Sequence, residues 1–378
     1  MAGSQTVFLI LTKDPTSVQG NTEKHYLSAF LSRRSRLHVF APLEGSVQGA
    51  SDYPLPVTGI GGAFVLNILL APYWVYQFAT ERPDIVYCYQ NVILPALLGE
   101  YMLGATVAFD IRSDPYDQTQ EFFEEDDRGL AFKLAMRVAR SLHAVVLQRV
   151  DHVFVLSEAL ADSVVENYSV DREQIRLLPL GVDTDRFRPS DESYDRLSIV
   201  YAGSLARYRG IDTLIDAVGG LSEEHQCQIR VDLYGSGPEE YVSELIADAT
   251  QDSEFDIHWH GPVSHEELPT KAARSDIAVS PIPPYEAFQV SSPAKVFEYL
   301  AMGLPVVASR IDPHERILND GETALLFNAD SPADCRAKLA RLVTDEELRT
   351  RLSVAAQEKS SQHSWEGRFQ VVADALEL

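Results

Sequence analysis

The chain has 378 residues, of which 45% are hydrophobic and 23% are charged, so it is long and apolar enough to bury two ordinary cores. Its formal net charge of -24 at pH 7 argues against nucleic acid as a partner, because phosphate backbones are bound by concentrated basic surfaces. The three cysteines, Cys88, Cys227 and Cys335, have no Cys-x-x-Cys spacing, so we predict neither a disulfide framework nor a zinc site.

The first residues begin an apolar strand almost at once, without a basic region ahead of it. This pattern differs from a secretory signal peptide, so we expect a protein that stays in the cytoplasm.

Short apolar runs alternate with helix-length segments over the first 180 residues, as in a parallel, doubly wound sheet. The predicted strands are Val7–Leu11, Leu37–Phe40, Ile85–Tyr87, Thr106–Phe109, Val153–Leu156 and Ile175–Leu178. We therefore predict an N-terminal Rossmann-like domain at residues 1–180.

The alternation restarts after a linker at residues 181–194, which predicts a second Rossmann-like domain at residues 195–363. Its expected strands are Leu197–Tyr201, Ile229–Tyr234, Ile257–His260, Ile277–Ser280, Pro305–Ala308 and Ala324–Phe327. We expect the two domains to face each other across a cleft. In such sheets ligands bind beyond the carboxyl ends of the strands, where the glycine loops after Tyr201 and Tyr234 fall.

A short helix is predicted just before the strand at Pro305–Ala308. Ser292 suits its N-cap and Pro293 its first position, and its free N–H groups would attract an anion. Lys295 and Glu298 then lie on one face, and Gly303 ends the helix. This combination indicates a site for a nucleotide diphosphate.

A nicotinamide dehydrogenase shares this fold class, but the glycine pattern disfavours it. The loop Thr12–Asn21 contains one glycine, and the run Gly235-Ser236-Gly237-Pro238 lacks the third glycine of Gly-x-Gly-x-x-Gly.

Several segments together resemble the retaining, family 4 glycosyltransferases of the GT-B fold. They are Ser291–Ser309, Tyr201–Asp212, Pro179–Asp183, Gly235–Pro238 and Ser364–Glu366. The resemblance implies transfer of a sugar from a nucleotide-diphosphate donor to a hydroxyl of a glycan or lipid-linked saccharide, without a metal or a bound cofactor. It also implies that a last helix, at residues 364–378, completes the N-terminal domain.

By this resemblance, two cations hold the diphosphate as negative charge builds up on it. Arg209 stands where the family usually has a lysine, and Lys295 is the second. Ser204 replaces an arginine that many members carry, and Arg207 either compensates for it or points to solvent. The alternative for each cation is a solvent-exposed side chain.

Glu298 matches the family glutamate that accepts hydrogen bonds from the ribose. Val290 occupies the place of the family's other motif glutamate, so the donor sugar is expected to be held either by the backbone of Ser291 and Ser292 or by residues of the first domain. The resemblance places the nucleobase beside main-chain groups in a further set of residues: Gly235, Gly237, Pro238 and Val263.

The first domain offers two weaker candidates. Gly20 and Asn21 lead into a helix and either contact phosphate or form an ordinary turn. Arg112 and Asp114 follow a buried strand and either touch the sugar, orient the acceptor hydroxyl or cap the next segment.

Two other functions remain open at this stage. The departures at Val290 and Ser204 also suit a catalytically degenerate, nucleotide-binding scaffold. A nucleotide-sugar epimerase of the same fold is the third hypothesis.

The segment Ala63–Thr80 has no charged residue, but Asn67, Pro72 and Gln77 interrupt it, so we do not predict a transmembrane helix. A mostly buried helix is the leading interpretation. The alternative is an exposed apolar surface that touches either a bilayer, at the inner face of the cell membrane, or the lipid part of an acceptor, helped by basic residues at helical spacing. Those residues are Lys133, Arg137 and Arg140.

Overall fold

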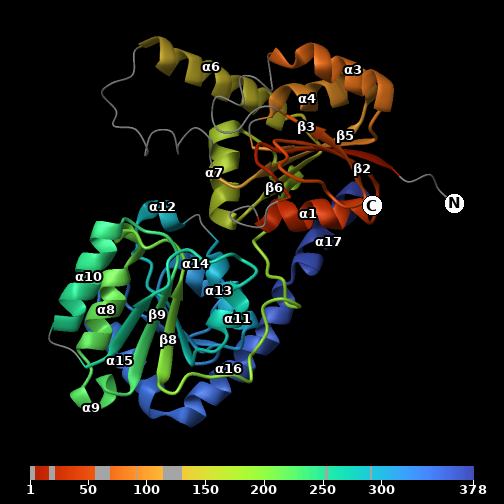
Figure 1. Cartoon of the computed structure of the whole chain (residues 1–378). Coiled ribbons are helices and arrows are strands. Elements are labelled where there is room, and N and C mark those ends of the chain that lie inside the picture. The colour runs from red at the N-terminus through yellow and green to blue at the C-terminus, as the bar shows by residue number, and fades with distance from the viewer. Residues whose placement is uncertain are drawn as a thin grey trace. The chain divides into compact units, whose positions relative to one another are not determined.

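The structure is a computed structural model, and it describes residues 5–16, 22–55, 69–90, 92–113, 130–251, 254–289 and 292–378. The predictions at Gly20, Asn21, Asp114, Val290 and Ser291 lie outside the described residues. The chain divides into two compact units (Figure 1). Unit 1 comprises Met1–Leu180 and Trp365–Leu378, and unit 2 comprises Gly181–Ser364.

Unit 1 contains a parallel sheet of seven strands in the order β3-β2-β1-β4-β5-β6-β7. The strands are β1 (Thr6–Ile10), β2 (Arg36–Ala41), β3 (Ala50–Pro54), β4 (Ile85–Tyr89), β5 (Thr106–Ile111), β6 (His152–Val155) and β7 (Ile175–Leu177). Six of them are the predicted strands, with ends shifted by one or two residues. The edge strand β3 was not predicted, because its half-exposed sequence Ala-Ser-Asp-Tyr-Pro has no apolar run.

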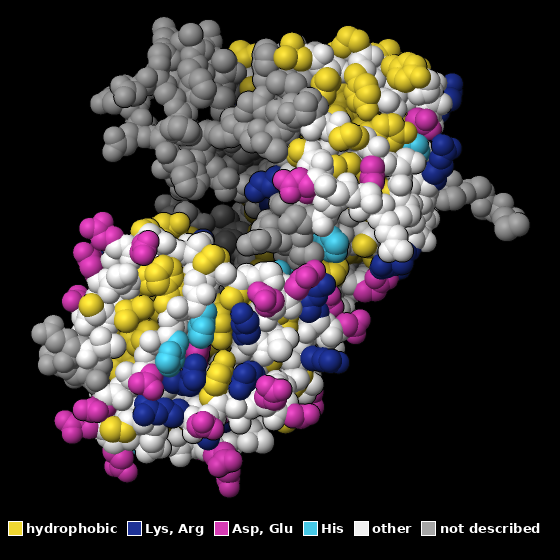
Figure 2. Space-filling model, viewed as in Figure 1, with side chains coloured by type: hydrophobic (Ala, Val, Ile, Leu, Met, Phe, Trp, Pro, Cys, Tyr) yellow, Lys and Arg dark blue, Asp and Glu magenta, His cyan; other side chains and the backbone are white. Residues whose placement is uncertain are grey.

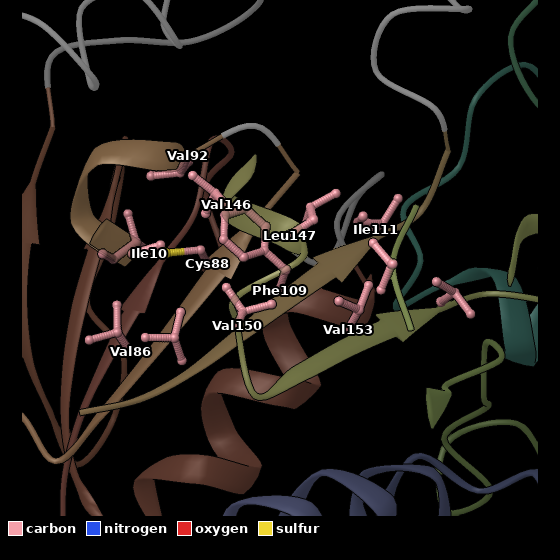
Figure 3. Close-up of a cluster of buried hydrophobic side chains, with 14 of the residues drawn as sticks. Ile10, Val86, Cys88, Val92, Phe109, Ile111, Val146, Leu147, Val150 and Val153 are labelled. Carbon is pink, nitrogen blue, oxygen red and sulfur yellow. The ribbon is translucent and has the colours of Figure 1, made fainter. Parts of the chain in front are cut away.

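Both faces of this sheet are buried, because side chains of each strand alternate between two cores. On β1, Phe8 and Ile10 join one core, whereas Val7 and Leu9 join the other. Figure 3 shows the first core, where strand residues such as Phe109 meet α6.

Helices cover each face of the unit 1 sheet. The first face carries α3 (Ala71–Glu81), α4 (Ile93–Leu98), the π-helix η2 (Gly99–Leu103), α6 (Leu130–Leu147) and α7 (Glu158–Tyr168). The second face carries α1 (Thr22–Ser32) and α17 (Trp365–Leu376), which pack against each other. The 3-10 turn η3 (Arg172–Gln174) precedes β7.

Unit 2 contains a parallel sheet of six strands in the order β10-β9-β8-β11-β12-β13. The strands are β8 (Leu197–Ala202), β9 (Ile229–Tyr234), β10 (Asp256–Trp259), β11 (Ile277–Ser280), β12 (Val306–Ser309) and β13 (Ala324–Phe327). All six were predicted. Most of them are buried parallel strands, which appear in the sequence as short apolar runs, whereas the edge strand β10 is half-exposed. The fold class of two Rossmann-like domains is thus confirmed.

The helices of unit 2 follow the strands in the alternation expected of this fold. They are η4 (Arg207–Arg209), α8 (Ile211–Gly219), α9 (Glu223–Gln226), α10 (Glu239–Gln251), α11 (Leu268–Ala272), α12 (Glu286–Gln289), α13 (Ala294–Ala301), α14 (Asp312–Glu315), α15 (Pro332–Thr344), α16 (Glu346–Ser360) and η5 (Ser361–His363).

The start of α13 differs from the prediction. Pro293, with a ψ of 92°, is the N-cap residue, so the helix begins at Ala294 and neither Ser292 as cap nor Pro293 as first helical residue is correct. The extended backbone at Pro293 shifts the start by one residue. The predicted end is confirmed, because Gly303 follows the last turn with a φ of 68°, a left-handed conformation that favours glycine.

Candidate active site

The predicted residues of unit 2 gather where its strand order reverses. β8 lies beside both β9 and β11, so the helices that follow these strands leave in different directions and open a space at their carboxyl ends. The loops after β8 and β9, together with α13, border this space.

The loops after β8 and β9 are bound to each other through their backbones. The N–H of Gly203 donates to the Tyr234 carbonyl at 2.8 Å, and the N–H of Leu205 donates to the Ser236 carbonyl at 2.8 Å. A Cβ at Gly235, whose φ is 143°, would lie 1.8 Å from the Gly203 oxygen. Glycine is therefore required at position 235 to hold these loops together.

Lys295 lies in the first turn of α13, and its side chain is enclosed by the β8 loop. Its Nζ is 3.8 Å from the centre of the Tyr201 ring, and a Cβ on Gly203 would approach it to 2.8 Å. The Tyr299 hydroxyl accepts a 2.7 Å hydrogen bond from the Ala202 N–H, which holds α13 against β8. Burial and the nearby charge of Arg209 lower the pKa of Lys295 to about 7, although Glu298 raises it.

Arg209 ends the turn η4, next to the same space. Its guanidinium carbon lies 5.0 Å from the Phe288 ring and 5.4 Å from the Tyr208 ring. Its Nε is buried and has no hydrogen-bond partner within the described part of the chain. The structure thus brings Arg209 and Lys295 together without a carboxylate that pairs with either among the described residues, an arrangement that attracts an anion.

Arg207, three residues beyond Ser204, is engaged elsewhere. Its Nη2 lies 3.7 Å from a Glu244 oxygen, and its guanidinium covers the Tyr241 ring at 4.5 Å. The hypothesis that Arg207 replaces the charge missing at Ser204 is therefore not supported. Its side chain borders a hollow of about 500 Å³ that also includes Pro238.

Glu298 is held by a residue that the sequence did not single out. Nε2 of His265 lies 3.0 Å from Oε1 of Glu298, and each side chain is only 14% exposed. The His265 ring packs edge-to-face against Phe187, with 5.0 Å between ring centres. The prediction reached this loop at Val263, but only the fold shows that His265 meets the helix residue Glu298.

The candidate in unit 1, Arg112, is surrounded by partners of its own unit. Its guanidinium forms an ion pair with Glu23 and donates to Asp110 Oδ2 at 2.7 Å and to the Leu178 carbonyl at 2.6 Å. Burial raises the pKa of Glu23, which lies in the first turn of α1. The partnership with Glu23 was not predicted, because 88 residues separate it from Arg112 in the sequence.

Two family models match the chain. The model described as Glycosyltransferase Family 4 matches residues 25–186, and that described as Glycosyl transferases group 1 matches residues 196–345. The first match lies almost wholly in unit 1 and the second in unit 2, so together they account for most of the chain.

Among curated relatives, the MMP alpha-(1->4)-mannosyltransferase of Mycolicibacterium hassiacum is 30% identical over 203 residues, covering 52% of this chain and 46% of that protein. The chain spans about half the length of the curated relatives it matches.

Solved structures resemble the whole chain. The sucrose-phosphate synthase of Thermosynechococcus elongatus has a TM-score of 0.74 at 18% identity and covers 99% of this chain and 98% of its own. Anabaena HepE, in complex with UDP and glucose, has a TM-score of 0.70 at 15% identity and covers 99% of both chains. These likenesses show the GT-B fold.

Proposed function

Because the chain belongs to glycosyltransferase family 4, we propose that it moves a sugar from a nucleotide-diphosphate donor to a hydroxyl of an acceptor. The observation that carries this proposal is the pair of cations in unit 2. Arg209 and Lys295 meet at the carboxyl ends of the strands, and within the described residues no carboxylate forms an ion pair with either.

The proposed role of these cations is to stabilise the leaving diphosphate. The transition state is oxocarbenium-like, and negative charge grows on the diphosphate as the bond to the sugar breaks. The planar guanidinium of Arg209 suits two phosphate oxygens, while the ammonium of Lys295 acts as a point charge. We propose transfer with retention at the front face of the sugar, in which a donor phosphate oxygen takes the proton of the acceptor hydroxyl, without a metal.

The other candidate residues of unit 2 would bind the nucleoside. Glu298, oriented by His265, accepts hydrogen bonds from the ribose hydroxyls in this proposal. The backbones at Gly235, Gly237 and Val263, with Pro238, contact the base. A UDP sugar is the first donor to test, since the structurally similar HepE is described with UDP and glucose.

The remaining assignments complete the proposal. The backbones of Ser291 and Ser292 hold a hexose, Ser204 borders the diphosphate, and Gly20 with Asn21 contact phosphate. Arg112 contributes by positioning Asp110 and Glu23, because its described hydrogen bonds all stay within unit 1.

The proposed acceptor is a growing glycan or a lipid-linked saccharide, and the proposed place of action is the cytoplasm, at the inner face of the cell membrane. The relatives favour transfer over the two alternatives, a degenerate scaffold and an epimerase.

The test is a turnover assay that measures release of the nucleoside diphosphate from UDP, GDP and ADP sugars, with saccharide acceptors present. Arg209→Ala is expected to lower kcat by about 100- to 1000-fold, as loss of a transition-state charge partner does. The matched control is Arg207→Ala, a neighbouring arginine that pairs with Glu244 and is expected to keep turnover near the wild-type value. Equal rates in wild type and Arg209→Ala would remove the assignment.

A further inference from the structure

Unit 1 carries a concentration of exposed apolar side chains on one layer of helices. Eight of the twelve large hydrophobic residues that are exposed in the described chain lie on or beside α3, η2 and α6. These eight residues, which we call the outer helical surface, are Leu69, Val75, Tyr76, Tyr101, Met102, Val138, Leu142 and Val145. Figure 2 shows hydrophobic side chains gathered over α3, at the upper right.

The elements that carry this surface are neighbours. α3 packs against α4, and α4 packs against both η2 and α6, all on the same face of the sheet (Figure 1). On α6, Val138, Leu142 and Val145 recur at the spacing of one helix face, and they point away from the core to which Val146 and Leu147 belong. The sheet core is therefore already filled beneath them, and their exposure is not needed to build unit 1.

The leading sequence prediction for this region, a mostly buried helix, holds for only one side of α3. Trp74 and Phe78 are fully buried in the core, whereas Tyr76 is 64% exposed and Val75 is 45% exposed. Within the described residues every helix is too short or too polar to span a bilayer. α3 is thus apolar on the side that packs against the core and also carries exposed apolar side chains on its outer side.

The charges along α6 are opposite to those of the whole protein, whereas α3 ends with Glu81 and η2 contains Glu100. The chain has 56 acidic and 32 basic residues, yet residues 130–149 contain no acidic residue. The described part of this segment contributes three arginines, Arg137, Arg140 and Arg149. Arg140 also covers the Tyr168 ring at 5.4 Å, while Arg137 and Arg149 are exposed.

We propose that the outer helical surface docks on an anionic lipid bilayer. Aliphatic side chains enter the boundary between headgroups and acyl chains, the tyrosines lie at headgroup level, and the arginines meet lipid phosphates. A second copy of the chain suits this surface less well, because a two-fold interface would bring arginines of like charge together. None of the residues of this surface belongs to the site of the proposed reaction.

The test is flotation of the full chain with vesicles of phosphatidylcholine, alone or mixed with phosphatidylglycerol. We expect the wild type to float with the anionic vesicles, less so with the neutral ones, and less so at high salt, which screens the arginines. Val138→Asp is expected to weaken binding by about tenfold or more, because a charge replaces an inserted side chain. Arg137→Gln with Arg149→Gln should weaken binding to anionic vesicles only.

The matched control is Val354→Asp on α16 of unit 2, where the valine is 53% exposed compared with 52% for Val138. This variant should float like the wild type. Circular dichroism and thermal melting establish that each variant is folded, and nucleotide binding is measured separately so that its loss is not mistaken for loss of docking. Three outcomes would each overturn the proposal. The wild type could float with neither kind of vesicle, the two valine variants could float equally well, or the protein could form a dimer in solution that Val138→Asp dissociates.

Discussion

Each unit holds charged side chains at the carboxyl end of its central strands, but the two groups differ in how the charges are compensated. In unit 1, Arg112 is closed in by Glu23, Asp110 and a backbone carbonyl. In unit 2, Lys295 and Arg209 lie together, and no ion pair with either is found in the part of the chain that the structure describes. A compensated cluster is complete without a ligand, whereas an uncompensated pair of cations is stabilised by an anion.

Its described partners make Arg112 part of a compensated cluster, whereas Arg209 and Lys295 are candidate phosphate-binding groups. Their positions in the sequence do not reveal this difference, because each of the three follows a buried strand or begins a helix. Arg112 was singled out because it follows a buried strand, Lys295 because it lies in the first turn of a predicted helix, and Arg209 because of the family resemblance. The partners around each group distinguish them, and those partners come from distant parts of the sequence.

The largest expected effect concerns stability. Arg112→Met leaves Glu23 and Asp110 buried without their cation and is expected to lower the free energy of unfolding of unit 1 by about 3–5 kcal/mol. Lys295→Met removes a half-buried cation that has no ion pair among the described residues, so we expect the stability of unit 2 to change by less than about 1 kcal/mol or to rise. Hydrogen exchange at pH 7 measures the free energy of unfolding of each unit separately.

The two substitutions are matched in kind, since each replaces one cation by methionine. Equal destabilisation of the two units, or an unchanged unit 1 in Arg112→Met, would contradict the distinction between a compensated and an uncompensated site.

A second prediction concerns pH and donor binding. The pKa of Lys295 is lowered to about 7 in the free protein by burial and by Arg209, and a bound diphosphate would raise it again. Binding of UDP above pH 7.5, where its phosphates are fully ionised, should therefore take up a proton. Affinity should fall as the pH rises from about 7.5 to 9, by up to about tenfold per unit. Calorimetry in buffers of different ionisation enthalpy measures the uptake.

Lys295→Arg is the control for this pH dependence, because arginine stays charged throughout the range. The variant should show neither proton uptake nor the fall in affinity. A wild type that binds UDP without taking up a proton would show that Lys295 is already charged before the ligand arrives.

A third prediction concerns the pair of His265 and Glu298. His265→Ala removes the group that orients the Glu298 carboxylate. We expect nucleotide binding to weaken by about five- to tenfold, which is the effect of losing one hydrogen bond, and kcat to change little. His265→Gln, which keeps a donor, should restore part of the affinity. A loss of kcat without a change in donor KM would place His265 in a different role.

The smallest expected effect tests the corrected start of α13. Ser331 accepts a 3.1 Å hydrogen bond from the Asp334 N–H and caps α15, so Ser331→Ala should cost about 1 kcal/mol of stability. Ser292 does not cap α13, and Ser292→Ala should change stability by less than about 0.5 kcal/mol. Urea unfolding measures the loss of stability in each variant. An equal loss in Ser331→Ala and Ser292→Ala would show that Ser292 caps α13, as the sequence predicts.

Most of the fold could be predicted because most of the strands are buried on both sides and appear as short apolar runs. β3 escaped prediction as a half-exposed edge strand, and the start of α13 was misplaced by one residue because Pro293 adopts an extended backbone.

The candidate site was only partly predictable. Lys295 and Glu298 were singled out by their spacing on a predicted helix, and the family resemblance added Arg209 and the roles of all three. The structure places them at one end of the sheet of unit 2. His265 and Glu23 could not be predicted, because their importance comes from tertiary contacts with Glu298 and Arg112 rather than from a local pattern. The roles assigned to these residues in transfer stay predictions.

The measurement that tests the central claim most directly is calorimetric titration of UDP, GDP and ADP into the wild type and into Lys295→Met. We predict that the wild type binds one of the three nucleotides and that the variant binds it about 10- to 100-fold more weakly, since a charge-assisted bond is lost. Equal affinity in both proteins, or no binding of any nucleotide to the wild type, would contradict the claim that the paired cations of unit 2 hold a nucleotide diphosphate.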